Sequence, residues 1–127
     1  MPAQIVRLNA DGGAPDVEVA FGQAQIGNYA CHRWRDPAST TSETIAHGNN
    51  VDDLPDQFSL KDRPAALRGN VLGFSILIQA ASPGPGQLYS YTIVIRQDGQ
   101  VVPGGSIRRT GSLGESALAF LEYVRLA

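Results

Sequence analysis

The chain has 127 residues, a formal net charge of −2 and a hydrophobic share of 43%. This length suits one domain, and the composition suits a chain that folds around a hydrophobic core rather than a disordered one. The near-neutral charge lacks the basic excess of nucleic-acid binders, so we expect no nucleic-acid partner. The single cysteine, Cys31, excludes an intramolecular disulfide. We therefore expect residues 1–127 to form one small soluble domain.

The N-terminal residues contain no apolar segment of the kind that a secretory signal needs. The longest apolar stretch, residues 71–81, is interrupted by glycine and polar residues and is too short for a membrane helix. We expect no transmembrane segment. The sequence favours a protein that is cytoplasmic, or one that is exported without a cleaved signal peptide.

Apolar and polar residues alternate with a period of two along most of the chain, which predicts strands. Turn-forming residues, chiefly glycine, proline and aspartate, separate the alternating segments. The strands are expected at residues 4–8, 16–21, 24–34, 57–60, 70–81, 89–97, 100–102 and 106–109. This pattern predicts an all-β chain, an antiparallel β-sandwich of about seven to nine strands.

The same alternation assigns side chains to faces. On the third strand, Trp34 and His32 share one face and are expected to pack together, whereas Arg33 lies on the other face. Tyr89 and Tyr91 are in line with two isoleucines of their strand, so we expect both tyrosines in the core.

Two turns are marked by their residues. Asp98 and Gly99 lie between two β-prone segments, which is the strongest short-range signal for a hairpin. The interruption at residues 103–105, with one proline and two glycines, predicts a bulge or bend on an edge strand.

The C-terminal segment, residues 117–126, fits two patterns. Ser112 and Glu115 have the spacing of a helix capping box, ahead of apolar residues at helical spacing. The segment also alternates as a strand, with Glu122 as the only misfit. Because a closing strand covers a sheet edge that a short helix leaves open, we expect a strand, with a short helix as the alternative.

Residues 36–56 lose the alternation and predict a long polar loop, with one short strand at residues 43–46. Structureless loops of about 20 residues are uncommon in compact domains and are usually functional or disordered. This loop supplies several oxygen ligands of the type that calcium prefers, namely Asn49, Asn50, Asp52, Asp53 and Asp56. Their spacing is not that of an EF-hand, and the same residue types are ordinary in turns.

The two histidines give little support to catalysis. His32 follows Cys31, but neighbours on a strand point to opposite faces and do not form a nucleophile–base pair. His47 lies in the polar loop, where it is able to approach an aspartate, so a small enzyme with a His/Asp site is one hypothesis. The chain has no Gly-x-Ser-x-Gly elbow, no His-Glu-x-x-His helix and no paired-cysteine metal knuckle.

The absence of catalytic spacing favours a non-catalytic binding or interaction module with a protein or carbohydrate partner. Its candidate ligand-binding residues are Trp34, His47 and Arg33, because aromatic residues and arginine are enriched in binding hot spots. Such a module requires no cofactor. The alternative is a calcium-binding module that uses Asn50, Asp52, Asp53 and Asp56 in residues 49–56. Exposed edge strands are able to pair with a second copy of the chain, so a homodimer is a further hypothesis.

Overall fold

The computed structural model describes residues 3–23, 25–52, 54–82, 84, 86–114 and 117–127, which form nine strands and one short helix. The expected all-β class is therefore confirmed. The helix, α1 (Pro64–Leu67), begins on a proline, a residue that suits a first helical turn. The strands are β1 (Gln4–Val6), β2 (Asp16–Gly22), β3 (Ile26–Trp34), β4 (Glu43–Asn49), β5 (Asp56–Ser59), β6 (Val71–Gln79), β7 (Gln87–Gln97), β8 (Gln100–Leu113) and β9 (Leu118–Leu126).

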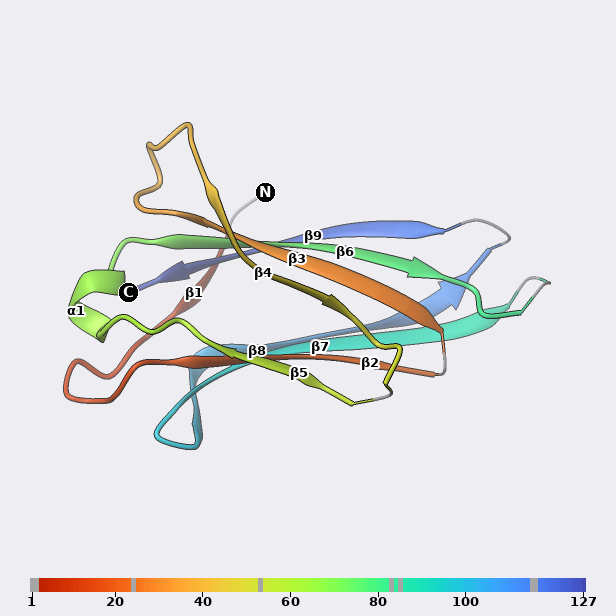
Figure 1. Cartoon of the computed structure of the whole chain (residues 1–127), viewed down its shortest axis with the longest axis horizontal. Coiled ribbons are helices and arrows are strands. Elements are labelled where there is room, and N and C mark those ends of the chain that lie inside the picture. Colours follow the sequence, from red (N-terminus) through yellow and green to blue (C-terminus); the bar gives the residue numbers. More distant parts are fainter. Residues whose placement is uncertain (1–2, 24, 53, 83, 85, 115–116) are drawn as a thin grey trace.

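The strands are arranged in two sheets (Figure 1). One sheet has five strands in the order β1-β9-β6-β3-β4, and the other has four in the order β5-β2-β7-β8. Every pairing is antiparallel except that of β1 with β9, which is parallel. The expectation of a purely antiparallel arrangement is wrong at this edge. The two strands come from opposite ends of the chain, so no hairpin turn sets their relative direction.

The core lies between the two sheets, whose inner faces carry the buried side chains. The ring of Phe120, on β9, lies 5.4 Å from the ring of Tyr89 and 5.4 Å from that of Tyr91, both on β7 in the other sheet. Tyr91 is 1% exposed and Tyr89 is 9% exposed, which confirms that both tyrosines belong to the core. Aliphatic residues fill the rest of this layer, among them Val17, Val19, Leu72, Ile76, Ile78, Ile93, Ile95 and Val124.

The expectation of one long polar loop is wrong, because the strand β4 divides residues 36–56. This strand extends beyond the short one expected at 43–46, and β5 already begins at Asp56. The pairing of β3 with β4 shifts its register between Cys31 and His32, so that Ile45 is an extra residue on β4. The bulge interrupts the period of two, which explains why the sequence pattern did not reveal the whole strand.

Both turn expectations are confirmed. Asp98 and Gly99 have φ angles of 52° and 80°, and they join β7 to β8 through the pair of Gln97 and Gln100. Positive φ at both central residues is the geometry of a type I′ hairpin turn. The pairing of β7 with β8 becomes irregular between Val94 and Arg96, opposite the predicted bend.

The C-terminal segment is a strand, as expected, and not a helix. The capping box is not formed, because Ser112 belongs to β8, while Glu115 lies outside the described residues. Glu122, the misfit of the alternation, does point inward and is 8% exposed. Its carboxylate accepts a hydrogen bond of 3.3 Å from the Tyr91 hydroxyl and one of 3.2 Å from Arg109 on β8. Burial raises the pKa of Tyr91, so its hydroxyl stays protonated and able to donate.

This arrangement predicts the response to two substitutions of Glu122. Glu122→Ala leaves the buried Tyr91 hydroxyl without its acceptor and should lower the free energy of unfolding by about 1–3 kcal/mol. Glu122→Gln keeps an acceptor oxygen and should have a smaller effect. Urea unfolding of the three proteins measures both values. Equal losses for the two variants would show that the hydrogen bond from Tyr91 is unimportant.

Candidate functional site

The outward face of the five-stranded sheet, which we call the apolar face, differs from the usual solvated face of an antiparallel sheet. Such faces are normally polar. Here, the positions that alternate with core residues on β3, β6 and β9 include no aspartate or glutamate. These outward positions are Ile26, Asn28, Ala30, His32, Trp34, Val71, Gly73, Ser75, Leu77, Gln79, Ala119, Leu121, Tyr123 and Arg125.

An aromatic cluster, His32, Trp34 and Tyr123, occupies one half of the apolar face. The rings of Trp34 and Tyr123 are 6.2 Å apart, and those of His32 and Trp34 are 6.5 Å apart, which confirms the expected packing of His32 beside Trp34. Trp34 lies over Gly73, where an added Cβ would be 2.7 Å from the indole ring and 3.1 Å from the Tyr123 ring. Glycine at position 73 therefore allows the indole to lie close to the sheet.

An apolar hollow of about 570 Å³ occupies the other half of this face. Across β3, β6 and β9 its floor is low because the outward residues there include Ala30, Ser75 and Ala119. Leu77 and Leu121 rise beside these small residues and are 38% and 54% exposed. The cluster and the hollow thus lie next to each other on one surface.

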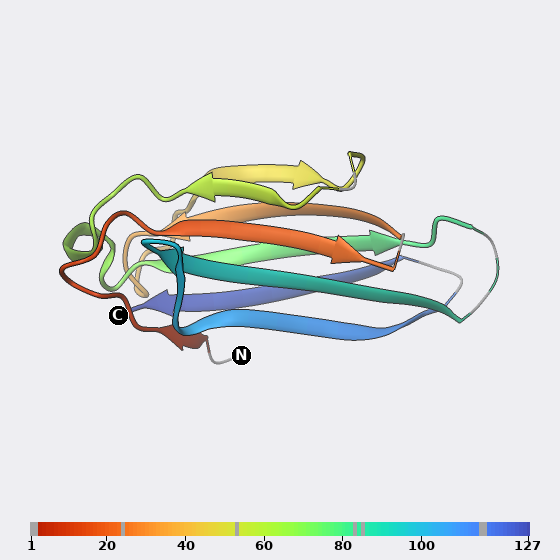
Figure 2. The same cartoon turned by 90° about the horizontal axis from the view of Figure 1, so that it is seen from below.

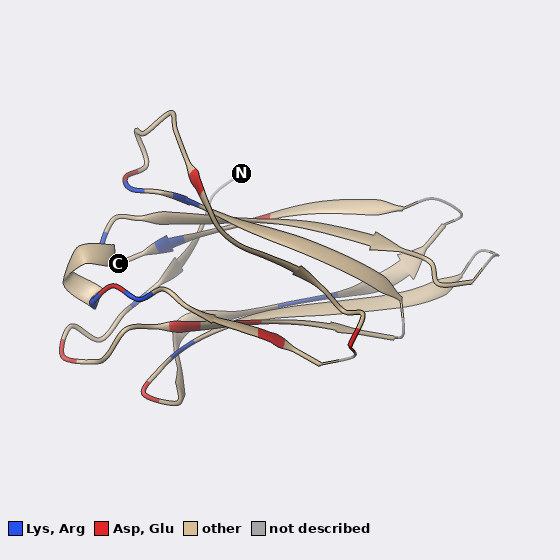
Figure 3. Cartoon of the chain, viewed as in Figure 1, with Lys and Arg blue, Asp and Glu red and all other residues tan. Residues whose placement is uncertain are grey.

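Charge is nearly absent from this surface. The ribbons of β3, β6 and β9 are almost entirely tan in Figure 3, the colour of residues other than Lys, Arg, Asp and Glu. The charged residues of these strands are Arg33, Glu122 and Arg125, and the first two are buried. Arg125 is the one charged residue among the outward positions on these strands.

The outward face of the four-stranded sheet is more polar. There Glu18 forms an ion pair of 3.4 Å with Arg96 and accepts a hydrogen bond of 3.1 Å from Gln57. Leu88, which is 56% exposed, is an isolated large apolar residue on that face and makes a useful counterpart to Leu121.

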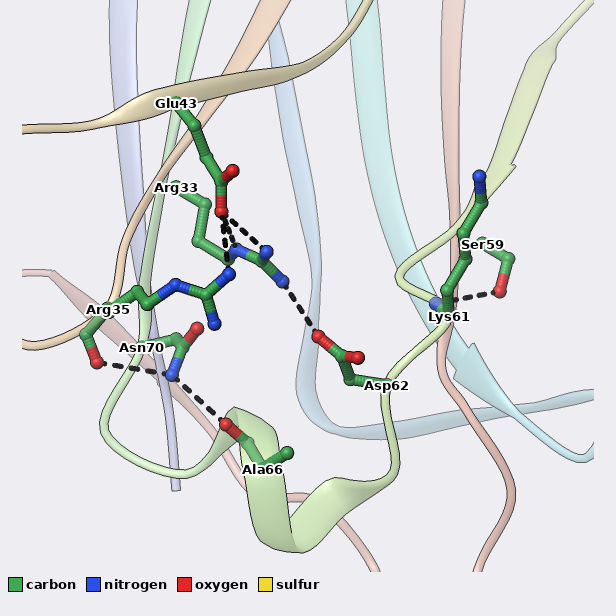
Figure 4. A network of polar contacts seen from close by, with 8 residues as sticks. All are labelled: Arg33, Arg35, Glu43, Ser59, Lys61, Asp62, Ala66 and Asn70. Atoms are coloured by element: carbon green, nitrogen blue, oxygen red, sulfur yellow. Dashed lines mark hydrogen bonds and ion pairs between the residues drawn. The ribbon is translucent and has the colours of Figure 1, made fainter.

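Arg33, an expected ligand-binding residue, points inward and is 9% exposed (Figure 4). Its guanidinium donates a hydrogen bond of 2.9 Å to Glu43 on β4 and one of 3.0 Å to Asp62 in the segment after β5. Arg35 also contacts Glu43, at 3.2 Å. These contacts tie the five-stranded sheet to the segment that follows the other sheet, so the charge of Arg33 is already neutralised within the chain.

The contacts of Arg33 make the free energy of unfolding depend on pH. The hydrogen bond and charge of Arg33 lower the pKa of Glu43 in the folded state. A carboxylate of this kind contributes stability above its unfolded pKa, about 4.3 for glutamate, and the contribution is lost as the pH falls through the lower folded value. The free energy of unfolding should therefore fall less steeply below about pH 4.3 in Glu43→Gln than in the unmodified chain. Urea unfolding at several acidic pH values measures the slopes, and parallel slopes would contradict the assignment.

His47 and Asp56 both line a cavity of about 490 Å³ between β4 and β5. These are the edge strands that lie side by side where the two sheets approach each other (Figure 2). Burial and the nearby carboxylate of Asp56 raise the pKa of Tyr29. Register pairs His47 with the outward Ala30, whereas the Asp56 carboxylate lies beside Gly48, the next residue along β4. Both residue types of the His/Asp hypothesis therefore line the cavity, but successive residues of a strand point to opposite faces, so His47 is directed away from Asp56.

The expected calcium ligands serve other purposes in the part of the chain that the structure covers. Asn50 accepts a hydrogen bond of 3.0 Å from the backbone of Gly27 and donates one to the Gln25 carbonyl. Asp52 accepts from the backbone of Leu54 at 3.1 Å, as turn aspartates do. Asp53 lies outside the described residues. Among residues that are described, no three histidine, cysteine, aspartate or glutamate side chains are grouped as a metal site.

The calcium hypothesis and the contacts that fix the loop make different predictions for Asn50→Asp, one for calcium affinity and one for the free energy of unfolding. A carboxylate at a calcium site would strengthen binding. Replacing the amide instead removes the donor to Gln25, and we expect a loss of about 0.5–1.5 kcal/mol in the free energy of unfolding. We also expect the thermal midpoint of the unmodified chain to be the same with calcium and with chelator. A calcium-specific rise in the thermal midpoint would instead support a calcium site in this loop.

Cys31 is 0% exposed and faces the core. Burial raises the pKa of its thiol to about 12, so the thiol stays protonated at neutral pH. A protonated, buried thiol is a poor nucleophile, which agrees with the opposite orientation expected for His32.

The chain matches no protein-family model, no curated protein and no solved structure. Within the described ranges no helix is long and apolar enough to span a membrane. Of the expected ligand-binding residues, only Trp34 lies in the aromatic cluster. Sequence reasoning missed Tyr123 in that cluster and missed Leu77 and Leu121 beside the hollow, although apolar residues on both faces of β6 and β9 were the available signal.

Proposed function

We propose that the chain is a non-catalytic binding module, a β-sandwich in type, which recognises its partner through the apolar face. The observation that carries this proposal is the contrast between the two outward faces. One bears the aromatic cluster and the apolar hollow, with Arg125 as its charged residue on β3, β6 and β9. The other bears ion pairs and hydrogen bonds. Contiguous apolar patches on a folded surface commonly mark interaction sites.

A protein partner suits this surface better than a carbohydrate. Trp34 and Tyr123 belong to residue types that act as anchors in protein interfaces, and they are also able to stack on sugar rings. Sugar recognition, however, needs several polar side chains placed around the ring. The hollow beside the cluster is lined mostly by small and aliphatic side chains, which fit apolar side chains of a protein.

Substitution of one leucine on each outward face tests the proposal. Leu121 and Leu88 are 54% and 56% exposed, so Leu121→Arg and Leu88→Arg introduce the same charge at equally exposed sites. Peptides selected from a random display library on the unmodified chain should bind Leu121→Arg at least tenfold more weakly, because a buried charge without a partner opposes binding. They should bind Leu88→Arg normally. Ligands that bind both variants equally well would contradict the proposed surface.

The single tryptophan gives a second readout of the same experiment. Trp34 is the only tryptophan of the chain and lies in the aromatic cluster. Its fluorescence should shift when a selected peptide covers the apolar face, and it should not respond to the same peptide in Leu121→Arg.

A further inference from the structure

We infer that the partner recognised by the apolar face is a second copy of this chain, packed face to face across a two-fold axis. This inference rests on the proposed function, since it names the occupant of the same surface. Three properties of the face support it: its shape, its charge and its area.

The shape of the face is self-complementary along the strands. Strand register places His32, Gly73 and Tyr123 in one row across β3, β6 and β9, with Ala30, Ser75 and Leu121 in the next outward row. The bulky aromatic cluster therefore lies toward one end of the face, and the hollow with its small residues lies toward the other. Interfaces with two-fold symmetry use the same patch on both copies, so a bulky region must meet a low region.

Two axes in the interface are compared, one parallel to the strands and one perpendicular to them. The perpendicular axis reverses the strand direction in the second copy. With Ser75 near this axis, register sets the Tyr123 ring of each copy over Ala119 of the other, and the Trp34 ring over Ile26 at the far end of β3. An axis parallel to the strands would place the aromatic clusters against each other and leave both hollows empty. The perpendicular axis is also compatible with the aligned packing that is common between sheets.

The charge on the face permits this arrangement. Arg125 lies at the same end of the strands as Trp34, because register pairs Val71 with both residues. The inferred axis places the two copies of Arg125 at opposite ends of the interface, where their repulsion is weak. The outward positions of β3, β6 and β9 carry no acidic side chain that would be buried without a partner.

The area of the face is large enough for a dimer. The strands β3, β6 and β9 have nine residues each, and β4 lies beside them. β4 has seven residues. At about 3.3 Å per residue and about 4.8 Å between strands, these four strands cover roughly 540 Å². Two copies therefore bury about 1,100 Å² before side-chain relief is counted, which exceeds the roughly 1,000 Å² expected of a biological interface.

Pairing through edge strands, the other route to a homodimer, is less favourable. β4 carries a bulge, and the edge strands β1 and β5 have only three and four residues. The edge strand β8 contains Pro103, which lacks a backbone donor. Short edge strands, bulges and prolines are devices that protect sheet edges from further pairing, so we assign the contact to the face.

Sedimentation equilibrium over a wide range of concentrations tests the inference. The unmodified chain should reach twice its monomer mass of 13.5 kDa. Leu121→Arg should raise the dimer dissociation constant at least tenfold, whereas Leu88→Arg should leave it unchanged. Far-ultraviolet circular dichroism and a thermal melt confirm that each variant is folded. A variant that fails to fold is replaced by Ala119→Arg, which places the charge in the hollow itself.

Cross-linking tests the orientation of the axis. Ser75 lies near the centre of the face and close to the inferred axis, whereas Gln79 lies at one end of β6. A short bismaleimide should therefore join two chains of Ser75→Cys efficiently and two chains of Gln79→Cys poorly. The native Cys31 is buried and should not react. Efficient linkage through position 79, with or without linkage through position 75, would overturn the inferred packing.

The two proposals fail in different ways. A chain that stays monomeric at every concentration overturns the second copy as partner. If peptides selected on that monomer still lose affinity for Leu121→Arg, the binding function of the face stands. A dimer that dissociates in Leu88→Arg and persists in Leu121→Arg overturns the inference by placing the contact on the opposite face.

Discussion

Side chains alternate between two faces along β3, β6 and β9, and this constraint governs the rest of the molecule. Each of these strands gives one face to the core, where Leu72, Phe74 and Ile76 are almost completely buried. The residues between them must then point outward. Apolar residues on both faces of a strand are typical of sheets that are covered on both sides. The four-stranded sheet covers only the inner side, so the strand sequences themselves support the proposal that a partner covers the outer side.

Two of the three charged residues on β3, β6 and β9 point toward the core, which leaves the outward face nearly uncharged. Arg33 and Glu122 both point inward, and they lie near opposite open sides of the two sheets. Arg33 reaches Asp62 beyond β5, while Glu122 binds Arg109 on β8. The first ion pair links the five-stranded sheet to the segment after β5, and the second links it to the four-stranded sheet. Inward-pointing charges also discourage the addition of further strands at such sides.

The alternation predicted the strands and most of their faces, including the core positions of Tyr89 and Tyr91. It did not reveal all of β4, because the extra residue Ile45 breaks the period. Glu122 seemed a misfit because its partners, Tyr91 and Arg109, are distant in sequence and no local pattern indicates them. The alternation also predicted that His32 packs beside Trp34, which is confirmed. The sequence pattern did not predict the partners of Arg33. One of them, Asp62, follows β5 and reaches Arg33 only through the tertiary fold.

The parallel pair of β1 and β9 has a consequence for how the chain reaches this structure. It joins Gln4 to Val124, so one side of the five-stranded sheet depends on residues from nearly opposite ends of the sequence. A contact of this kind closes a very long loop and is among the slowest to form. During synthesis β1 leaves the ribosome long before β9, its partner in the sheet. Val6 must therefore wait without its burial site until β9 has been made, and removal of either strand would open the same side of the sheet.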